Sequence, residues 1–585
     1  MMLKSLKGSG IGFWRVSEME LVLKNGFVYD PANNINGEKK DIFIKNGKIV
    51  ESVNRNAKKI DCSGKIVMPG GVEIHSHIAG GKVNSGRILR PEDHFKHVQA
   101  KTELRRGCTG YSTPSTFAVG YLYSQLGYTT AFTGAIPPHT ARHTHEELHD
   151  IPMLDKSELV LMGNNWFLLR YLRDKDYERA AVYVAWLLKA TRGYAIKIVN
   201  PGGGEAWGWG KNVRSIDDPV PHFDITPGEI ISGLMEVNEL LNLPHSIHVH
   251  FNNLGRMGNY KTTIDSLELT RDKKSSRDRQ VMQATHLQFH SYGGDSWKTF
   301  ESRSDEIAKD VNRRDNIAMD TGNLIFGDTT TMTADAPMEY YLASLTKYKW
   351  MNRDIELETS PGITPMFYSK KSPISTVQWA VGLELALLID DPWKVMITTD
   401  HPNGGPFINY PTVFAWLMSS KYREETMTGL NSAVEKKAIL ATIDRELDFN
   451  EIAIGTRAAQ AKSLGLQETK GHLGAGADAD IAVYDINPEV IDPSRDYKAI
   501  EKSFRMAAYT IKDGKILVRD GEIVKVVDGK TLYVNAEVGE ELKKDVMKDI
   551  EYNFKRFYSV NLNNYPVQEL YLTNPTAINI ETKLE

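Results

Sequence analysis

The middle of the chain alternates short apolar segments with longer amphipathic ones. The apolar segments YAIKIVN, HSIHVHF, QATHLQFH, NIAMDT and KVMITTD are typical of buried strands. Segments such as YERAAVYVAWLLKATRG and TPGEIISGLMEVNELLN are typical of helices, and Thr226 and Glu229 of the second form a capping box. Because strands that alternate with helices assemble into parallel sheets, the pattern predicts a parallel α/β fold. The length of the segment, residues 73–445, suits a large (β/α)₈ TIM-like barrel.

Both ends of the chain instead show short strands separated by tight turns. Turn signals stand at Asn25-Gly26 and Asn46-Gly47 near the start, and at Asp513-Gly514 and Asp520-Gly521 near the end. The simplest topology is a small composite β-sandwich domain built from residues 19–72 and 446–540, with the barrel inserted between them. Residues 1–18 are predicted to be a leader, either disordered or the result of an early start codon. Residues 541–585 are predicted to be an extension packed on the barrel or on a partner.

The composition is that of a soluble globular enzyme. The chain has 585 residues, a formal net charge of -4 and 41% hydrophobic residues. Without a basic excess, nucleic acid is not an expected partner, and no stretch approaches the roughly 18–20 apolar residues of a membrane span. The two cysteines, Cys62 and Cys108, cannot form a disulfide framework or a cysteine-based metal site. They indicate a reducing, cytoplasmic setting.

The histidine pair His75 and His77 ends the apolar segment that follows a Pro-Gly-Gly turn. Residues i and i+2 of a strand point to the same side, so both imidazoles face the active-site end of a barrel. An HxH pair alone is weak evidence for metal binding, because two satisfied polar side chains at a strand end are the more common case.

Lys197 lies between Ile196 and Ile198 in a segment that should be buried. A buried ammonium is costly unless it is paired or neutralised. Three interpretations follow: a buried salt bridge, an edge strand with the lysine turned to solvent, or a neutral amine that reacts with CO₂. The product of the last, a carbamate, has two anionic oxygens that can bridge two cations.

Three further residues complete a set of polar side chains at strand ends. His250 and His286 offer imidazoles, which are common ligands of zinc, and Asp400 offers a carboxylate that can bind a metal and exchange a proton. The neighbouring His248 and His290 are alternatives to the first two. Each residue taken singly is more often structural, but six competent ligands in order at successive strand ends are far more specific.

This arrangement resembles the amidohydrolase superfamily, in particular members with dihydroorotase- and hydantoinase-like binuclear sites. PGGVEIHSH is similar to the first barrel strand of that family, TTDHP to the eighth, and GHLGAGADADIAVYD to the returning β domain. More specifically, the segments AIPPHTARHTHEELHDIP, YAIKIVNPGGGEAWGWG, HVHFNNLGRMGNY, THLQFHSYGG and WKVMITTDHPNGGPFINYP resemble the A subunits of formylmethanofuran dehydrogenases.

The resemblance implies roles for individual residues. His75 and His77 would bind one divalent metal together with Asp400 and a carbamate on Lys197. His250 and His286 would bind a second metal that shares the carbamate, and both metals are expected to be zinc. Asp400 would also be catalytic, and His139 would be a polar group on the substrate side.

The resemblance also implies an activity and partners. The reaction would be the reversible condensation of formate with methanofuran to N-formylmethanofuran, as one step of CO₂ reduction in methanogenesis. Partners would be a molybdopterin subunit with tungsten or molybdenum that generates formate, and iron–sulfur subunits. The alternative is a stand-alone cyclic amidase of the dihydroorotase or hydantoinase type, which would share the same metal ligands. A non-catalytic relative is disfavoured, because all six ligand positions hold competent residues.

Overall fold

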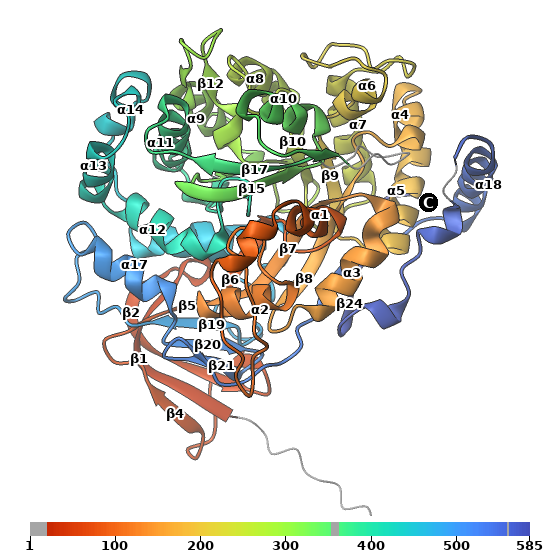
Figure 1. The fold of residues 1–585 in the computed structure, drawn as a ribbon. Coiled ribbons are helices and arrows are strands. Elements are labelled where there is room, and N and C mark those ends of the chain that lie inside the picture. The colour runs from red at the N-terminus through yellow and green to blue at the C-terminus, as the bar shows by residue number, and fades with distance from the viewer. Residues whose placement is uncertain (1–19, 353–361, 559–560, 585) are drawn as a thin grey trace, which may run out of the picture.

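A computed structural model describes residues 20–352, 362–558 and 561–584, so the leader predicted for residues 1–18 lies outside it. Its centre is a parallel barrel, as predicted (Figure 1). Within the described residues, eight strands pair in sequence order: β6 (Gly71–Ser76), β7 (Tyr128–Ile136), β8 (Asp155–Leu161), β9 (Ala195–Val199), β10 (Ile247–His250), β11 (Met282–Ala284), β14 (Ile317–Asp320) and β18 (Val395–Met396).

The barrel is nearly closed by contacts between its last and first strands. The backbone N–H of His77 donates to the carbonyl of His401 at 2.7 Å, and the Thr398 hydroxyl donates to the carbonyl of His75 at 3.3 Å. Helices surround the strands: α2 (Thr116–Gln125), α3 (Ala141–Asp150), α4 (Trp166–Arg173), α5 (Tyr177–Thr191), α7 (Pro227–Leu240), α8 (Tyr260–Glu268), α9 (Ser304–Asn312), α11 (Pro373–Leu388) and α12 (Tyr410–Met418). The capping box predicted from Thr226 and Glu229 begins α7.

The two chain ends together form a separate, mostly antiparallel sheet, which confirms the predicted second domain in outline. Its strands are β1 (Glu20–Asp30), β2 (Ile35–Lys45), β3 (Lys48–Val50), β4 (Lys58–Asp61), β5 (Ile66–Pro69), β19 (Ile481–Tyr484), β20 (Tyr509–Lys512), β21 (Lys515–Arg519) and β22 (Glu522–Ile523). A core of its own unites both ends, with Leu23 and Ile44 packed in the same cluster as Ile481 and Ile511. The strands share one hydrogen-bonded sheet.

Three of the four predicted turns are confirmed. Asn46-Gly47, Asp513-Gly514 and Asp520-Gly521 each join antiparallel strands, with both residues at positive φ, as a two-residue hairpin of this twist requires. The prediction at Asn25-Gly26 is wrong. β1 continues through this pair, and the register of its pairing with β2 shifts there. The pair forms a β-bulge, which accepts the same Asn-Gly sequence as a hairpin turn.

The C-terminal part departs from the expected division. β23 (Thr531–Glu537) lies within the range predicted for the β domain, but it pairs with β8 of the barrel and with β24 (Pro575–Glu581). Helix α18 (Glu540–Phe557) packs on α5, and the ring of Phe554 stacks on Phe167 with centroids 5.2 Å apart. Residues 446–463 include α15 (Phe449–Ala453) and α16 (Ala459–Ser463), and α16 contacts β6 of the barrel. The domain boundaries therefore remain a proposal.

A small layer covers the barrel between its last two strands. It consists of β15 (Gly327–Thr333), β16 (Met351–Asn352), β17 (Gly362–Tyr368) and helix α10 (Ala336–Thr346). This layer contacts α1 (Gly81–Leu89), which follows β6 (Figure 1). None of the described helices combines the length and the apolar character needed to cross a membrane.

Candidate metal centre and its cavity

One cavity brings together all six residues that the sequence analysis selected as metal ligands. Its volume is about 370 Å³, and its lining includes His75, His77, Lys197, His250, His286 and Asp400. Each side chain comes from a barrel strand or from the loop that follows the carboxyl end of the strand. The parallel strands place these ends at one mouth, which is where barrel enzymes carry their active sites.

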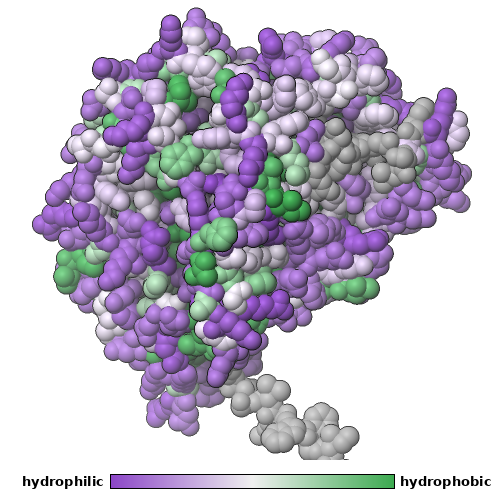
Figure 2. Space-filling model, in the orientation of Figure 1, coloured by the Kyte–Doolittle hydropathy of each residue, from purple (hydrophilic) through white to green (hydrophobic). Residues whose placement is uncertain are grey.

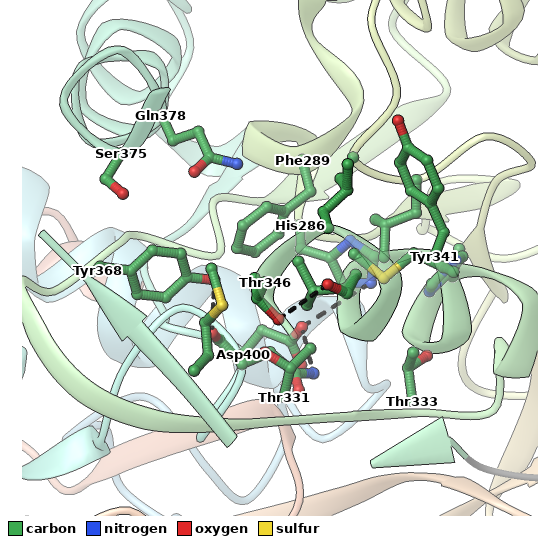
Figure 3. Close-up of a pocket in the computed structure, with 18 of the residues that line it drawn as sticks. His286, Phe289, Thr331, Thr333, Tyr341, Thr346, Tyr368, Ser375, Gln378 and Asp400 are labelled. Carbon is green, nitrogen blue, oxygen red and sulfur yellow. Dashed lines mark hydrogen bonds and ion pairs between the residues drawn. The ribbon is translucent and has the colours of Figure 1, made fainter. Parts of the chain in front are cut away.

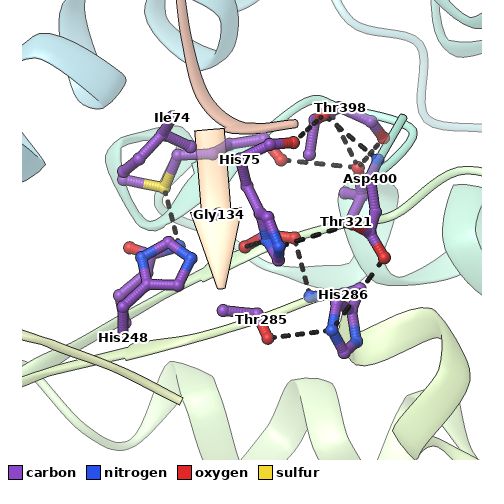
Figure 4. A network of polar contacts seen from close by, with 12 residues as sticks. Ile74, His75, Gly134, His248, Thr285, His286, Thr321, Thr398 and Asp400 are labelled. Carbon is purple, nitrogen blue, oxygen red and sulfur yellow. Dashed lines mark hydrogen bonds and ion pairs between the residues drawn. The ribbon is translucent and has the colours of Figure 1, made fainter. Parts of the chain in front are cut away.

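The first group of side chains lies around Asp400, and Figure 4 shows Asp400 in the same network as His75 and His286. Its Oδ1 lies 3.0 Å from Nε2 of His77 and 3.3 Å from Nε2 of His75. Two ligands of a tetrahedral zinc, each about 2.0–2.2 Å from the metal, stand about 3.3–3.6 Å apart. The spacing of these donors is therefore close to that of neighbouring ligands on one cation.

The second group contains nitrogen atoms that lack hydrogen-bond partners among the described residues. The Nζ of Lys197 is fully buried and has no hydrogen-bond partner among the described residues, and the same holds for Nδ1 of His286. The rings of His250 and His286 lie 4.8 Å apart between centroids. Buried polar atoms are almost always satisfied in folded proteins. Donors left open around one cavity therefore fit a bound cation.

Local backbone geometry makes room for these side chains. Gly134 of β7 has no side chain, and a Cβ there would lie 3.0 Å from Cδ2 of His75 and 3.4 Å from Cε1 of His77. His286 and Asp400 adopt positive φ values of 36° and 50°. Non-glycine residues rarely take this left-handed conformation, and functional sites are where it recurs.

Burial sets the protonation of the group. It holds the pKa values of His75, His77 and His286 well below 6.5, so these imidazoles are neutral, as metal ligands must be. Burial likewise lowers the pKa of Lys197 to about 7, although Asp320 and Asp400 oppose the change. The pKa of Asp400 is raised well above 3.8 by burial, and bound cations would reverse that effect.

Four polar residues of the site were missed by the sequence analysis: Lys82, Asp320, Asp335 and Asn403. Asp320 Oδ2 lies 3.3 Å from Nδ1 of His75, and Asp320 Oδ1 accepts from the backbone N–H of His286 at 2.7 Å. It ends β14 as an acidic residue after an apolar run, the same signal that identified Asp400.

Asn403 donates to Asp400 Oδ2 at 2.8 Å. The Nζ of Lys82 donates to the carbonyl of Gly134 at 2.9 Å, and Nδ1 of His77 lies 3.2 Å from the same oxygen.

The histidines considered as alternatives lie elsewhere. His248 also points into the barrel and could join His75 and Asp320 in a metal-binding group. Its Nδ1, however, lies 2.9 Å from Nε2 of His245, and it is not part of the cavity lining, so the geometry favours His250. His290 is buried beside His250 with ring centroids 5.5 Å apart. His139 follows β7 but does not line the cavity, so its catalytic role stays a prediction.

A second acidic cluster is explained by lysines. Asp155, Asp478 and Asp480 lie close enough to hold a cation. Lys470 contacts all three, at 2.5–2.9 Å, and Lys512 lies 2.8 Å from Asp155. These ammonium groups already supply the positive charge, and the cluster joins the barrel to the β domain.

The remaining wall of the cavity is largely apolar and aromatic. Figure 3 shows Asp400 and His286 on one side, with Ser375 and Gln378 standing away from them on their helix. The wall comes from the covering layer, from α11 and from neighbouring loops, with lining residues that include Trp297, Met338, Tyr341, Leu345, Tyr348, Phe367, Tyr368, Ser375 and Gln378. Such a cavity accommodates an organic substrate whose reacting end reaches the polar floor.

The fold is that of a metal-dependent amidohydrolase-type subunit, and the cluster of buried candidate ligands at the mouth of the barrel fits that class. A model of the amidohydrolase family matches residues 58–518, which is most of the chain, and the chain belongs to this family.

Two relatives match the chain over nearly its whole length. Protein FwdA of Methanocaldococcus jannaschii is 55% identical over 569 residues, which are 96% of this chain and 99% of FwdA. One subunit of the formyltransferase/hydrolase complex Fhc of Methylorubrum extorquens is 35% identical over 512 residues, 86% of this chain and 89% of that protein. The crystal structure of that complex, FhcABCD, with methylofuran superposes with a TM-score of 0.87, at 32% identity, and covers 96% of this chain and 100% of that one.

The similarity to dihydroorotases is local. The dihydroorotase of Aquifex aeolicus is 43% identical over 65 residues, which are 10% of this chain and 15% of that protein. The alternative of a cyclic amidase therefore has much less support than the similarity to FwdA and to the Fhc complex.

Proposed function

We propose that this chain is the amidohydrolase subunit of a formylmethanofuran dehydrogenase-type complex. It would join formate to the primary amine of methanofuran and would hydrolyse N-formylmethanofuran in reverse. The observation that carries the proposal is the full-length similarity to FwdA and to one component of a complex crystallised with methylofuran, in a chain whose six candidate ligands line one cavity.

We further propose a binuclear zinc site. His75, His77 and Asp400 would hold one cation, His250 and His286 the other, and a carbamate on Lys197 would be shared. The carbamate forms when the neutral amine attacks CO₂ and releases a proton, and the burial of Lys197 favours that neutral amine. Bound cations would polarise the formyl oxygen and would make water acidic enough to react near neutral pH.

The chain's own residues would supply the proton transfers. In hydrolysis, water adds to the formyl carbon, the C–N bond breaks, and the amine leaves with a proton. Asp400 lies beside both His75 and His77 and can take the proton of water and return it to the amine. The apolar wall formed by the covering layer would limit the access of bulk water to the reacting groups.

The partners are part of the proposal. A chain with two cysteines lacks the four that an iron–sulfur cluster ordinarily takes, so CO₂ reduction at molybdopterin and electron transfer would reside in other subunits. Ile88, Phe95 and Val98 are 74%, 88% and 70% exposed at the end of α1 and on the segment that follows it. Figure 2 shows apolar side chains near the middle of this face, which is largely hydrophilic and has other apolar spots toward its edges. Free Cys62 and Cys108 support a reducing cytoplasm.

The first experiment measures formate release from N-formylmethanofuran by the zinc-loaded protein in bicarbonate buffer. Dihydroorotate and hydantoin serve as competing substrates. Release of formate without opening of either ring is the expected result. Ring opening without formate release would instead establish a cyclic amidase.

The second experiment tests the complex. Phe95→Ser is expected to weaken co-purification of the partner subunits while the metal content stays unchanged. Val490→Ser is the matched control, because Val490 is 74% exposed on the β domain. Equal recovery of partners with both variants would assign the partner contact to another face.

A further inference from the structure

Asp335 connects the metal centre to the wall of the cavity. It is buried at the start of α10, shortly after β15, and its two carboxylate oxygens have different partners. Oδ1 accepts from the Asn200 side chain at 3.0 Å and from the backbone N–H of Met338 at 3.2 Å. Oδ2 faces Nε2 of His250 at 3.2 Å. One carboxylate thus contacts a candidate metal ligand and caps the helix that walls the cavity.

The contact with His250 fixes which ring nitrogen can bind a metal. A neutral imidazole carries one N–H and one lone pair, and an ionised carboxylate can only accept. Asp335 therefore keeps the proton on Nε2 and leaves the lone pair on Nδ1. Metal-binding histidines are commonly oriented in this way by a carboxylate on their other nitrogen.

The neighbours of Asp335 hold it in this position. Asn200 follows β9 at a positive φ of 43°, and its Oδ1 accepts from the Asn252 side chain at 2.7 Å. Asn252 also donates to the carbonyl of Pro201 at 3.0 Å. The ends of β9 and β10 and the start of α10 are thereby joined in one hydrogen-bonded network.

We propose that Asp335 is a positioning residue that sets the tautomer of His250 for the second metal and couples occupancy of that metal to the placement of α10. Met338, Tyr341 and Leu345 of α10 line the substrate cavity. Loss of the carboxylate would weaken the second metal first and loosen the substrate wall with it. The inference rests on the proposed binuclear site.

The test replaces Asp335 by Asn in the full chain, purified without the iron–sulfur subunits, whose visible absorption would cover that of cobalt. Two donors, Asn200 and Met338 N–H, hold the amide oxygen of the new side chain in the place of Oδ1. Its NH₂ group then faces Nε2 of His250 and moves the ring proton to Nδ1. Zinc is counted per chain across a series of buffered free zinc concentrations, and the cobalt-substituted protein is examined by its visible d–d absorption.

The expected result is that Asp335→Asn retains one tightly bound metal and binds the second about 10- to 100-fold more weakly, with a changed cobalt spectrum. Asp335→Glu keeps a carboxylate and is expected to recover part of that affinity. Ser372→Ala is the matched control, because Ser372 caps α11, another wall of the cavity, and its hydroxyl accepts from the backbone of that helix at 3.2–3.3 Å. It should bind both metals as the unaltered protein does.

Two metals of unchanged affinity and an unchanged cobalt spectrum in Asp335→Asn would overturn the inference. If Asp335→Asn does not fold, Asp335→Glu is compared with Ser372→Ala instead. Equally weakened metal binding in these two variants would show that Asp335 acts only as a helix cap, and would overturn the inference. Fewer than two metals in the unaltered protein would contradict the proposed site itself, which is a separate outcome.

Discussion

Replacement of Lys197 by Met separates the destabilisation that this buried lysine causes from its proposed role in metal binding. In the metal-free protein its amine is fully buried without a hydrogen-bond partner among the described residues, and burial lowers its pKa from 10.5 to about 7. A change of this size corresponds to about 5 kcal/mol of preference for the neutral amine. Asp320 and Asp400 lose a nearby positive charge in the variant, so this figure is an upper bound.

The sign of the pH dependence follows from proton binding. The unfolded chain keeps the proton up to about pH 10.5, whereas the folded chain releases it near pH 7. Between these values the unfolded state binds more protons, so the free energy of unfolding contributed by Lys197 rises with pH. Below pH 7 both states hold the proton, and the folded state bears the full destabilisation of the buried ammonium. Metal-free Lys197→Met is therefore expected to be more stable than the unaltered protein at pH 6, by up to about 5 kcal/mol, and the gain should vanish near pH 10.

The assay is denaturation of both chelated proteins between pH 6 and pH 10, followed by circular dichroism, together with metal content after reloading in bicarbonate. Lys156→Met is the matched control: burial lowers the pKa of Lys156 to about 8, but this residue belongs to β8 and does not line the cavity. It should show a similar pH effect on stability and keep both metals, whereas Lys197→Met should lose them. Identical pH dependence of unaltered protein and Lys197→Met would refute the argument from burial, and full metal occupancy in Lys197→Met would refute the carbamate bridge.

Three further predictions concern catalysis, metal loading and stability. Asp400→Asn should lower the rate of formate release about 100- to 10,000-fold, as removal of a general base does, and an unchanged rate would assign the proton transfer to another group. Chelation should abolish formate release, and zinc should restore it in bicarbonate but not in CO₂-free buffer; recovery in both buffers would argue against the carbamate. Lys512→Met leaves Asp155 and Asp480 with one ammonium fewer and should cost about 3–5 kcal/mol, measured as a lower denaturation midpoint with unchanged metal content. A midpoint equal to that of the unaltered protein would mean that Lys470 alone satisfies the cluster.

Much of the fold could be predicted because it depends on local patterns. The period of the apolar residues distinguishes strands from helices, and their alternation in the middle of the chain leads to a parallel barrel. Hairpin turns were predictable where the two turn residues are all that separates the strands, as at Asn46-Gly47. The same pair at Asn25-Gly26 fits a bulge in a continuous strand, and the pairing of β1 with its neighbours determined the result.

The six candidate ligands share one local signal, a polar residue at the end of an apolar strand. Parallel strands bring their carboxyl ends to one mouth, so the sequence alone predicted that these side chains would meet. The exception was Asp320, which carries the same signal and was overlooked. The pairing of β23 was not predictable, for the opposite reason: a strand pattern shows that a segment will pair, but its partner, β8, lies far away in the chain.

The sequence by itself determined the type of each element, the side on which its polar residues stand and the chemical nature of the donors, because backbone geometry converts spacing into direction over a few residues. The tertiary structure decided which of these donors are buried, which have no hydrogen-bond partner, and which further residues contact them. Asp335 illustrates the difference: in the sequence it is an acidic residue before a helix, and its contact with His250 depends on the packing of α10 over the barrel. Contacts between residues far apart in the chain depend on the whole fold, and no local pattern encodes them.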